Sequence, residues 1–134
     1  MAKLTTIEGI GEAGAKKLAK ANVGSLATLL SRGATAKGRK ELAVASGITE
    51  KRLLEWVNRA DLMRIKGVGE EYSDLLEASG VDTIPELATR KPANLLEAMV
   101  ATNAKKKLVR QLPTEAKVAD WVAQAKKLPK VVKH

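Results

Sequence analysis

The chain has 134 residues, a formal net charge of +9 and 45% hydrophobic residues, so it can bury a core as one compact domain or as two packed half-domains. The charge favours polyanionic partners, although it also fits a basic protein that its lysines keep soluble. The absence of Cys excludes disulfides, thiolate metal sites and thiol nucleophiles within the chain. The sequence shows no signal-peptide pattern, and no apolar run approaches the roughly 20 residues of a membrane span. We therefore expect a soluble, cytoplasmic protein without a membrane partner.

Good helix formers dominate the first half, and no alternating run of β-branched residues predicts a strand. Ser25 is the expected N-cap of one helix, and Gly33 and Gly47 separate neighbouring helices. The pattern predicts helices at about 4–8, 12–21, from 25 onward, 35–46 and 49–60.

The second half shows the same order of elements. Gly80 stands where a C-terminal glycine cap is expected, and Thr83 and Glu86 have the spacing of a capping box. Pro92 and Pro113 separate later helices. The pattern predicts helices at about 61–66, 70–79, from 83 onward, 93–103 and 114–127.

The most informative feature is an internal repeat. Residues 4–11 read LTTIEGIG and residues 62–69 read LMRIKGVG, at an offset of 58 positions. Each half ends in a Trp-Val pair at an offset of 65, so the second half carries about seven extra residues, near its Lys-rich stretch and Pro113. We predict an all-α fold of two tandem pseudo-repeats of about five short helices each, with a first half at 1–60, a second half at 61–128 and a frayed tail at 129–134.

Trp56 and Trp121 fall at equivalent positions on the last predicted helix of each half. Their expected role is to anchor the core of that half, and the alternative is base stacking. Tyr72 is the only other aromatic residue, so a stacking platform for single strands would be hard to build.

Two glycine-rich segments share one pattern. Residues 7–18 read IEGIGEAGAKKL and residues 65–76 read IKGVGEEYSDLL. Each has an apolar residue, any residue, Gly-apolar-Gly, three further residues and a small residue, which is Ala15 in the first and Ser73 in the second. This pattern resembles the helix-hairpin-helix motif. Each half is therefore expected to begin with this motif. The whole chain resembles a largely uncharacterised family of small bacterial proteins in which the motif is doubled.

In the helix-hairpin-helix superfamily, the hairpin grips the backbone of a DNA duplex across the minor groove without reading its sequence. The glycines reverse the chain with positive φ angles, and the second helix then starts with free amides at the positive end of its dipole, which suits a phosphate. A monovalent cation sometimes joins hairpin carbonyls to phosphate, and no other cofactor is expected. The resemblance implies that the phosphate-facing amides are those of Gly9, Ile10 and Gly11, and of Gly67, Val68 and Gly69.

The charges around the two hairpins differ. Lys16, Lys17 and Lys20 follow the first hairpin, and Lys16 and Lys20 share a helix face from which they could reach flanking phosphates. Residues 61–91 carry four basic and seven acidic residues, so the second hairpin would repel DNA. We therefore expect DNA contact at the first hairpin. The alternative for both hairpins is a tight interhelical turn that only packs helices or docks a protein.

Positive charge gathers in two other places. Residues 105–134 carry nine basic and two acidic residues. Within them, Lys105, Lys106 and Lys107 would either extend a phosphate-binding surface or form a solvated face. The other cluster, in the first half, consists of Arg32, Lys37, Arg39 and Lys40.

Catalysis is not expected. The only His is residue 134, Cys is absent, and no spaced His, Asp and Glu cluster suggests a catalytic metal. Some glycosylases with this hairpin follow it with a Lys or Asp in a deep pocket, but residues 20–32 contain no Asp. No feature suggests a small-molecule substrate.

The sequence thus predicts a non-enzymatic protein that binds double-stranded DNA through backbone phosphates and, in that case, associates with the nucleoid. One alternative is a protein-interaction or scaffold module that uses the same fold. Another is RNA binding, because phosphate recognition barely distinguishes RNA from DNA.

Overall fold

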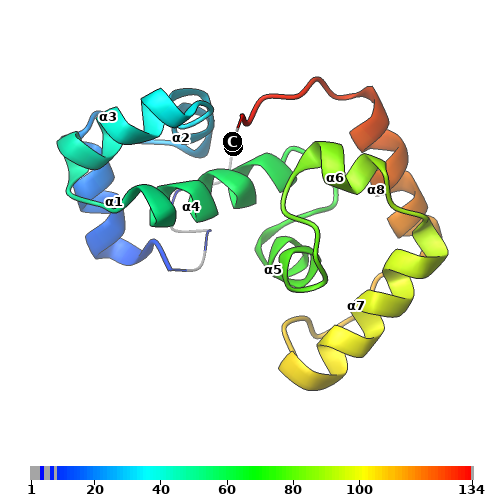
Figure 1. Ribbon diagram of the computed structural model, residues 1–134. Helices are drawn as coiled ribbons and strands as arrows, with labels where there is room; N and C mark the ends of the chain where they lie inside the picture. Colours follow the sequence, from blue (N-terminus) through cyan, green and yellow to red (C-terminus); the bar gives the residue numbers. More distant parts are fainter. Residues whose placement is uncertain (1–3, 5–6, 8, 134) are drawn as a thin grey trace. The chain divides into compact units, whose positions relative to one another are not determined.

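The structure, a computed structural model, describes residues 4, 7 and 9–133 (Figure 1). Over these residues it contains eight α-helices and no strand, which confirms the all-α prediction. Each of these helices is too short or too polar to cross a membrane. The helices are α1 (Gly11–Lys20), α2 (Leu26–Arg32), α3 (Ala36–Ser46), α4 (Glu50–Leu62), α5 (Glu70–Ala78), α6 (Ile84–Ala88), α7 (Pro92–Lys106) and α8 (Glu115–Lys127).

The chain divides into two compact units. Unit 1 comprises residues 1–61 together with residues 131–134, and unit 2 comprises residues 62–130. In unit 1, α1 and α2 both pack against α3. A fully buried leucine from each of the first four helices contributes to its core: Leu18, Leu29, Leu42 and Leu53.

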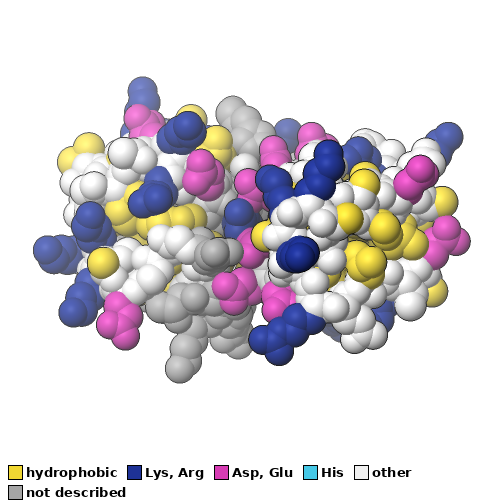
Figure 2. All heavy atoms as spheres, turned by 90° about the horizontal axis from the view of Figure 1, so that it is seen from below, with side chains coloured by type: hydrophobic (Ala, Val, Ile, Leu, Met, Phe, Trp, Pro, Cys, Tyr) yellow, Lys and Arg dark blue, Asp and Glu magenta, His cyan; other side chains and the backbone are white. Residues whose placement is uncertain are grey.

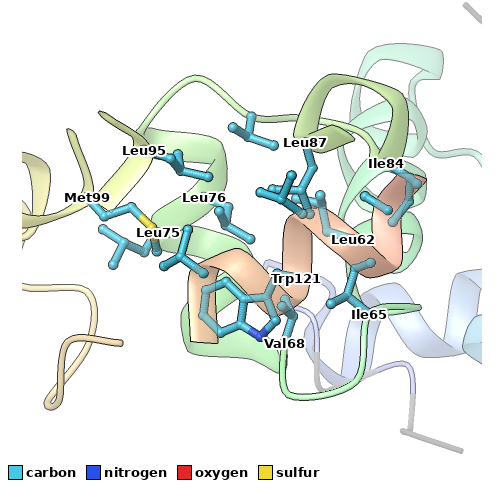
Figure 3. Packing of buried hydrophobic residues seen from close by; sticks show 14 of the residues in the cluster. Leu62, Ile65, Val68, Leu75, Leu76, Ile84, Leu87, Leu95, Met99 and Trp121 are labelled. Carbon is cyan, nitrogen blue, oxygen red and sulfur yellow. The ribbon is translucent and has the colours of Figure 1, made fainter. Parts of the chain in front are cut away.

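Unit 2 is built around α8. This helix packs against α6 and α7, and α5 packs against α7. Trp121 on α8 is 2% exposed and lies among Val68, Leu75 and Leu76 (Figure 3). Apolar side chains from α5, α6, α7 and α8 therefore share one core.

Local sequence signals explain several helix ends. The hydroxyl groups of Ser25, Thr35 and Thr114 each accept a hydrogen bond from the backbone amide three residues later, as N-caps do. Gly80 has a φ of +96° after the last turn of α5, which confirms the expected glycine cap. Thr83 makes no side-chain cap, and the Glu86 carboxylate instead accepts from the amide of Asp82 at 2.9 Å.

The helix expected at 61–66 is not present as a separate element. Helix α4 continues to Leu62, and turns follow over residues 63–67. The amide of Ile65 donates to the carbonyl of Leu62 at 3.2 Å, a bond over three residues that closes a tight turn rather than an α-helix. The helix expected at 4–8 lies mostly outside the described residues.

The end of the chain also differs from the fraying expected at 129–134. Val132 is 2% exposed, and the amide of Lys133 donates to the carbonyl of Ala34 at 2.7 Å. The buried Arg39 guanidinium donates to the carbonyls of Gly33 at 2.7 Å and Lys133 at 2.8 Å. Burial lowers the pKa of Arg39, and the nearby Glu50 carboxylate opposes that shift. These contacts hold residues 131–133 on unit 1.

Gly38 on α3 lies very close to the backbone at the end of α2. A Cβ atom at this position would lie 2.0 Å from the carbonyl oxygen of Arg32, and a backbone atom cannot move aside as a flexible side chain can. We expect Gly38→Ala to lower the free energy of unfolding by about 3 kcal/mol in a urea titration followed by circular dichroism. Gly24→Ala is the matched control, because its Cβ would meet nothing within 4 Å. Equal stability of the two variants would contradict this close contact.

Candidate functional site

The first hairpin is a tight reversal that leads directly into α1. The amide of Ile10 donates to the carbonyl of Ile7 at 3.3 Å, and the Ile10 side chain is 3% exposed. Gly9 has a φ of +94° and Gly11 a φ of +57°, conformations that a residue with a Cβ rarely adopts. The path of the chain therefore favours glycine at both positions.

The second hairpin has similar bonds but a different glycine. The amide of Val68 donates to the carbonyl of Ile65 at 3.1 Å, and Gly67 has a φ of +95°. Gly69, in contrast, is extended, with a φ of −104° that any residue can adopt. The expectation that both glycines of each pair have positive φ angles is therefore wrong at Gly69.

The hydrogen bonds of the turns change the set of available amide donors. The amides of Ile10 and Val68 already donate within their hairpins, so they do not face outward as expected. The helix termini that follow carry no side-chain cap at Ile10 or Gly69. Because the first amides of a helix have no intrahelical acceptor, the outward-facing donors lie in the first turns, at residues 11–13 and 70–72.

An indole ring lies beneath the first glycine of each hairpin. A Cβ at Gly9 would lie 3.6 Å from Nε1 of Trp56, and a Cβ at Gly67 would lie 3.1 Å from Nε1 of Trp121. The side chains of Trp56 and Trp121 are 4% and 2% exposed, in agreement with the anchoring role.

Three lysines give α1 its positive charge. Lys16, Lys17 and Lys20 are all exposed, and Glu12 is the single acidic residue of the helix. Figure 2 shows Lys and Arg side chains around a band of apolar side chains on unit 1, at the left. Lys17 also lines a hollow beside the hairpin, which brings part of this charge to the turn.

That hollow, which we call the hairpin hollow, has a volume of about 410 Å³. Arg52 and Trp56 both line the hollow, and the Arg52 guanidinium lies over the Trp56 ring, 5.9 Å from its centre. Sequence reasoning did not select Arg52, although its spacing of four residues from Trp56 on α4 is visible in the sequence. The hollow is lined by Gly9, Ile10, Ala13, Gly14, Lys17, Gly47, Ile48, Thr49, Arg52 and Trp56.

At the second hairpin, Tyr72 occupies the position that Gly14 holds in the first. Its ring centroid is 5.1 Å from that of Trp121, and its hydroxyl donates to the carbonyl of Gln111 at 2.9 Å. The loop after α7 is thereby tied to the hairpin. A shallower hollow of about 480 Å³ remains, and it includes the acidic residues Glu70 and Glu71.

The Lys-rich stretch does not reach this second hollow. Lys105 and Lys106 are exposed in the last turn of α7, and Lys107 is its exposed C-cap, with a φ of +50°. At that end of a helix, positive charge complements the dipole. Arg110 lines the hollow instead of the three lysines.

The described part of the chain contains no group of three or more His, Asp or Glu side chains placed to hold a metal ion.

The two glycines of the second hairpin should respond differently to substitution. Gly67→Ala combines a φ of +95° with a contact of 3.1 Å to the Trp121 indole, so we expect a loss of about 2 kcal/mol of unfolding free energy. Gly69→Ala should change stability by less than about 0.5 kcal/mol, because its φ is ordinary and its Cβ would meet nothing within 4 Å. Thermal unfolding of both variants measures the difference, and a large loss in Gly69→Ala would contradict the geometry.

Comparison with known proteins places the chain in a family. No curated protein matches the chain, and no solved structure does. Residues 8–128 match the family described as Domain of unknown function (DUF4332). Since that match covers most of the sequence, the chain belongs to the DUF4332 family.

Proposed function

We propose that the chain consists of two helix-hairpin-helix units and binds the backbone of double-stranded DNA through the first of them, without catalysis and without reading base sequence. The following observations support this proposal.

Backbone hydrogen bonds recur at the offset of the sequence repeat. The bond from Ile10 to Ile7 corresponds to that from Val68 to Ile65. Val23 bonds to Leu18, and Val81 bonds to Leu76, both at 2.9 Å. Arg32 and Arg90, 58 residues apart, each donate to the carbonyl of the residue 11 positions earlier. The recurrence of the same bonds supports duplication of one structural unit.

The observation that carries the functional proposal is the start of α1. This helix begins without a side-chain cap, and the exposed Lys16, Lys17 and Lys20 lie on the same helix. Free amides at a helix N-terminus attract anions, and the lysine charges add to that attraction. A Cβ at Gly11 would meet nothing within 4 Å, so space remains there for a phosphate to approach the backbone closely.

The second hairpin favours a phosphate much less. Helix α5 begins with Glu70 and Glu71, both exposed, and has no basic residue in its last turn. Carboxylates beside the free amides compete with a phosphate and repel it. The first hairpin is therefore the proposed contact with DNA.

The same acidic residues favour a second candidate function, the docking of a basic protein on α5. A pull-down after nuclease treatment separates the two functions. Partners that survive the nuclease, together with an absence of DNA binding, would favour docking. Competition between a duplex and a structured RNA tests the preference for DNA.

Fluorescence anisotropy with a short random-sequence duplex tests the DNA proposal. If three phosphates are neutralised, we expect the affinity to fall about 40-fold between about 50 and 200 mM salt, because bound phosphates release condensed cations. The variant Lys16→Glu/Lys20→Glu should lose about tenfold or more in affinity at low salt.

The matched control is Lys105→Glu/Lys106→Glu. It changes the net charge by the same amount, but in the last turn of α7, which belongs to unit 2. It should retain most of the affinity. Equal losses in both variants would assign binding to net charge rather than to the hairpin, and an affinity independent of salt would contradict binding through phosphates.

A further inference from the structure

We propose that the hairpin hollow binds a single nucleotide through its phosphomonoester, either as a free mononucleotide or as the phosphorylated end of a nucleic-acid strand. The site differs from the proposed duplex contact, because a hollow admits one nucleotide but not the convex backbone of a duplex. It can therefore exist whether or not the first hairpin binds duplex DNA.

The charge of the hollow suits a dianion. Lys17 and Arg52 line it, and none of the described residues that line it is acidic. Within the described part of the chain, neither of these two side chains forms an ion pair. A phosphomonoester carries a charge of about −1.5 to −2 at neutral pH, so it can engage two cations, whereas an internal phosphodiester carries only one charge.

The floor of the hollow includes the indole ring of Trp56. Trp56 is 4% exposed, and its Nε1 lies beside Gly9, which also lines the hollow. The indole N–H is a hydrogen-bond donor only, so its natural ligand partner is an acceptor oxygen such as those of a phosphate or a sugar.

The remaining walls fit a sugar or base. Ile10, Ala13 and Ile48 give the hollow apolar surface, and Arg52 already lies over the Trp56 ring. The volume of about 410 Å³ falls within the range of small-molecule sites. A nucleotide would contact both the charged and the apolar side chains of the hollow, whereas inorganic phosphate would contact only the charged ones.

The hollow at the second hairpin has a different lining, which includes Tyr72, Glu70 and Glu71. There, Tyr72 packs against the Trp121 ring and is anchored on Gln111. In unit 1 the corresponding residue is Gly14, whose Cβ would lie 3.2 Å from Ile10 and 3.3 Å from Trp56. Ile10 and Trp56 thus pack closely on Gly14 in unit 1, whereas a tyrosine at the equivalent position packs on the tryptophan ring in unit 2.

Nuclear magnetic resonance of the ¹⁵N-labelled full chain tests the proposal directly. The chain has two tryptophans, so two indole N–H signals are expected, and Trp121 serves as an internal control. Titration with thymidine monophosphate should shift the Trp56 signal and leave the Trp121 signal in place. Thymidine, which lacks the phosphate, and inorganic phosphate, which lacks the nucleoside, should each bind about tenfold more weakly. Equal binding of thymidine and its monophosphate would overturn the proposal, as would a shift of both indole signals together.

Three matched pairs of variants, each a lining residue and a control residue outside the hollow, locate the site. Lys17→Gln and Arg52→Gln remove a lining charge, and each should weaken thymidine monophosphate by about tenfold. Their controls, Lys40→Gln and Lys51→Gln, remove the same charge from exposed positions that do not line the hollow, and they should leave binding within about twofold. Ala13→Leu should block the site, whereas Ala19→Leu, at an exposed position of the same helix outside the hollow, should not. Equal losses within each pair would overturn the assignment.

A set of three duplexes of one sequence separates the two sources of the phosphate. One has 5′-phosphate ends, one has 5′-hydroxyl ends, and one is closed by loops and has no ends. A preference for phosphate ends that Ala13→Leu removes would assign the site to strand ends. Binding of the monophosphate without any end preference would assign it to free nucleotides. Binding of the closed duplex without any monophosphate binding would overturn this inference and leave the proposed function standing. Binding of the monophosphate without any binding of the closed duplex would contradict the proposed function and support a nucleotide site in the hollow.

Discussion

The contact between each tryptophan and the first glycine of its hairpin is the constraint on which the rest of the structure depends. Trp56 comes from the last helix of unit 1 and Trp121 from the last helix of unit 2, yet each indole lies against a turn more than 40 residues earlier. A Cβ would touch the ring at Gly9, at 3.6 Å, and would crowd it at Gly67, at 3.1 Å, and the positive φ disfavours a side chain at both positions. The contact therefore fixes where α1 and α5 begin, and with it the direction of their free amides.

One scaffold with this constraint carries two different surfaces. Beside Trp56 the chain has Gly14 and a hollow with two cations, whereas beside Trp121 it has Tyr72 and two exposed glutamates. Neither difference disturbs the turn, because Ile10 and Val68 make the same backbone hydrogen bond and both are buried. Binding chemistry can therefore change on the outer side of the hairpin while the inner side keeps the core intact.

The features predicted from sequence are those set by local interactions. Ser25 caps the start of α2 and Gly80 follows the end of α5, both as expected, because a cap depends on residues within one turn. Three other features could not be predicted from neighbouring residues. They are the conformation of Gly69, the continuation of α4 to Leu62 and the position of Arg52 beside the first hairpin. Each depends on which distant segment packs nearby, and a sequence repeat gives the order of elements without giving those neighbours.

Arginine and lysine side chains have different roles in this chain, and this difference affects which ligands the surface can recognise. Arg32, Arg39, Arg64 and Arg90 each donate to backbone carbonyls, so their forked guanidinium groups serve the fold. The exposed charge of α1 is carried by lysines, which act as flexible point charges and impose little geometry on a partner. Such a surface attracts any phosphate backbone with little discrimination. Arg52 differs, because its guanidinium lies over a buried indole at the edge of the hairpin hollow, where a planar group that makes directional hydrogen bonds can select one ligand over another.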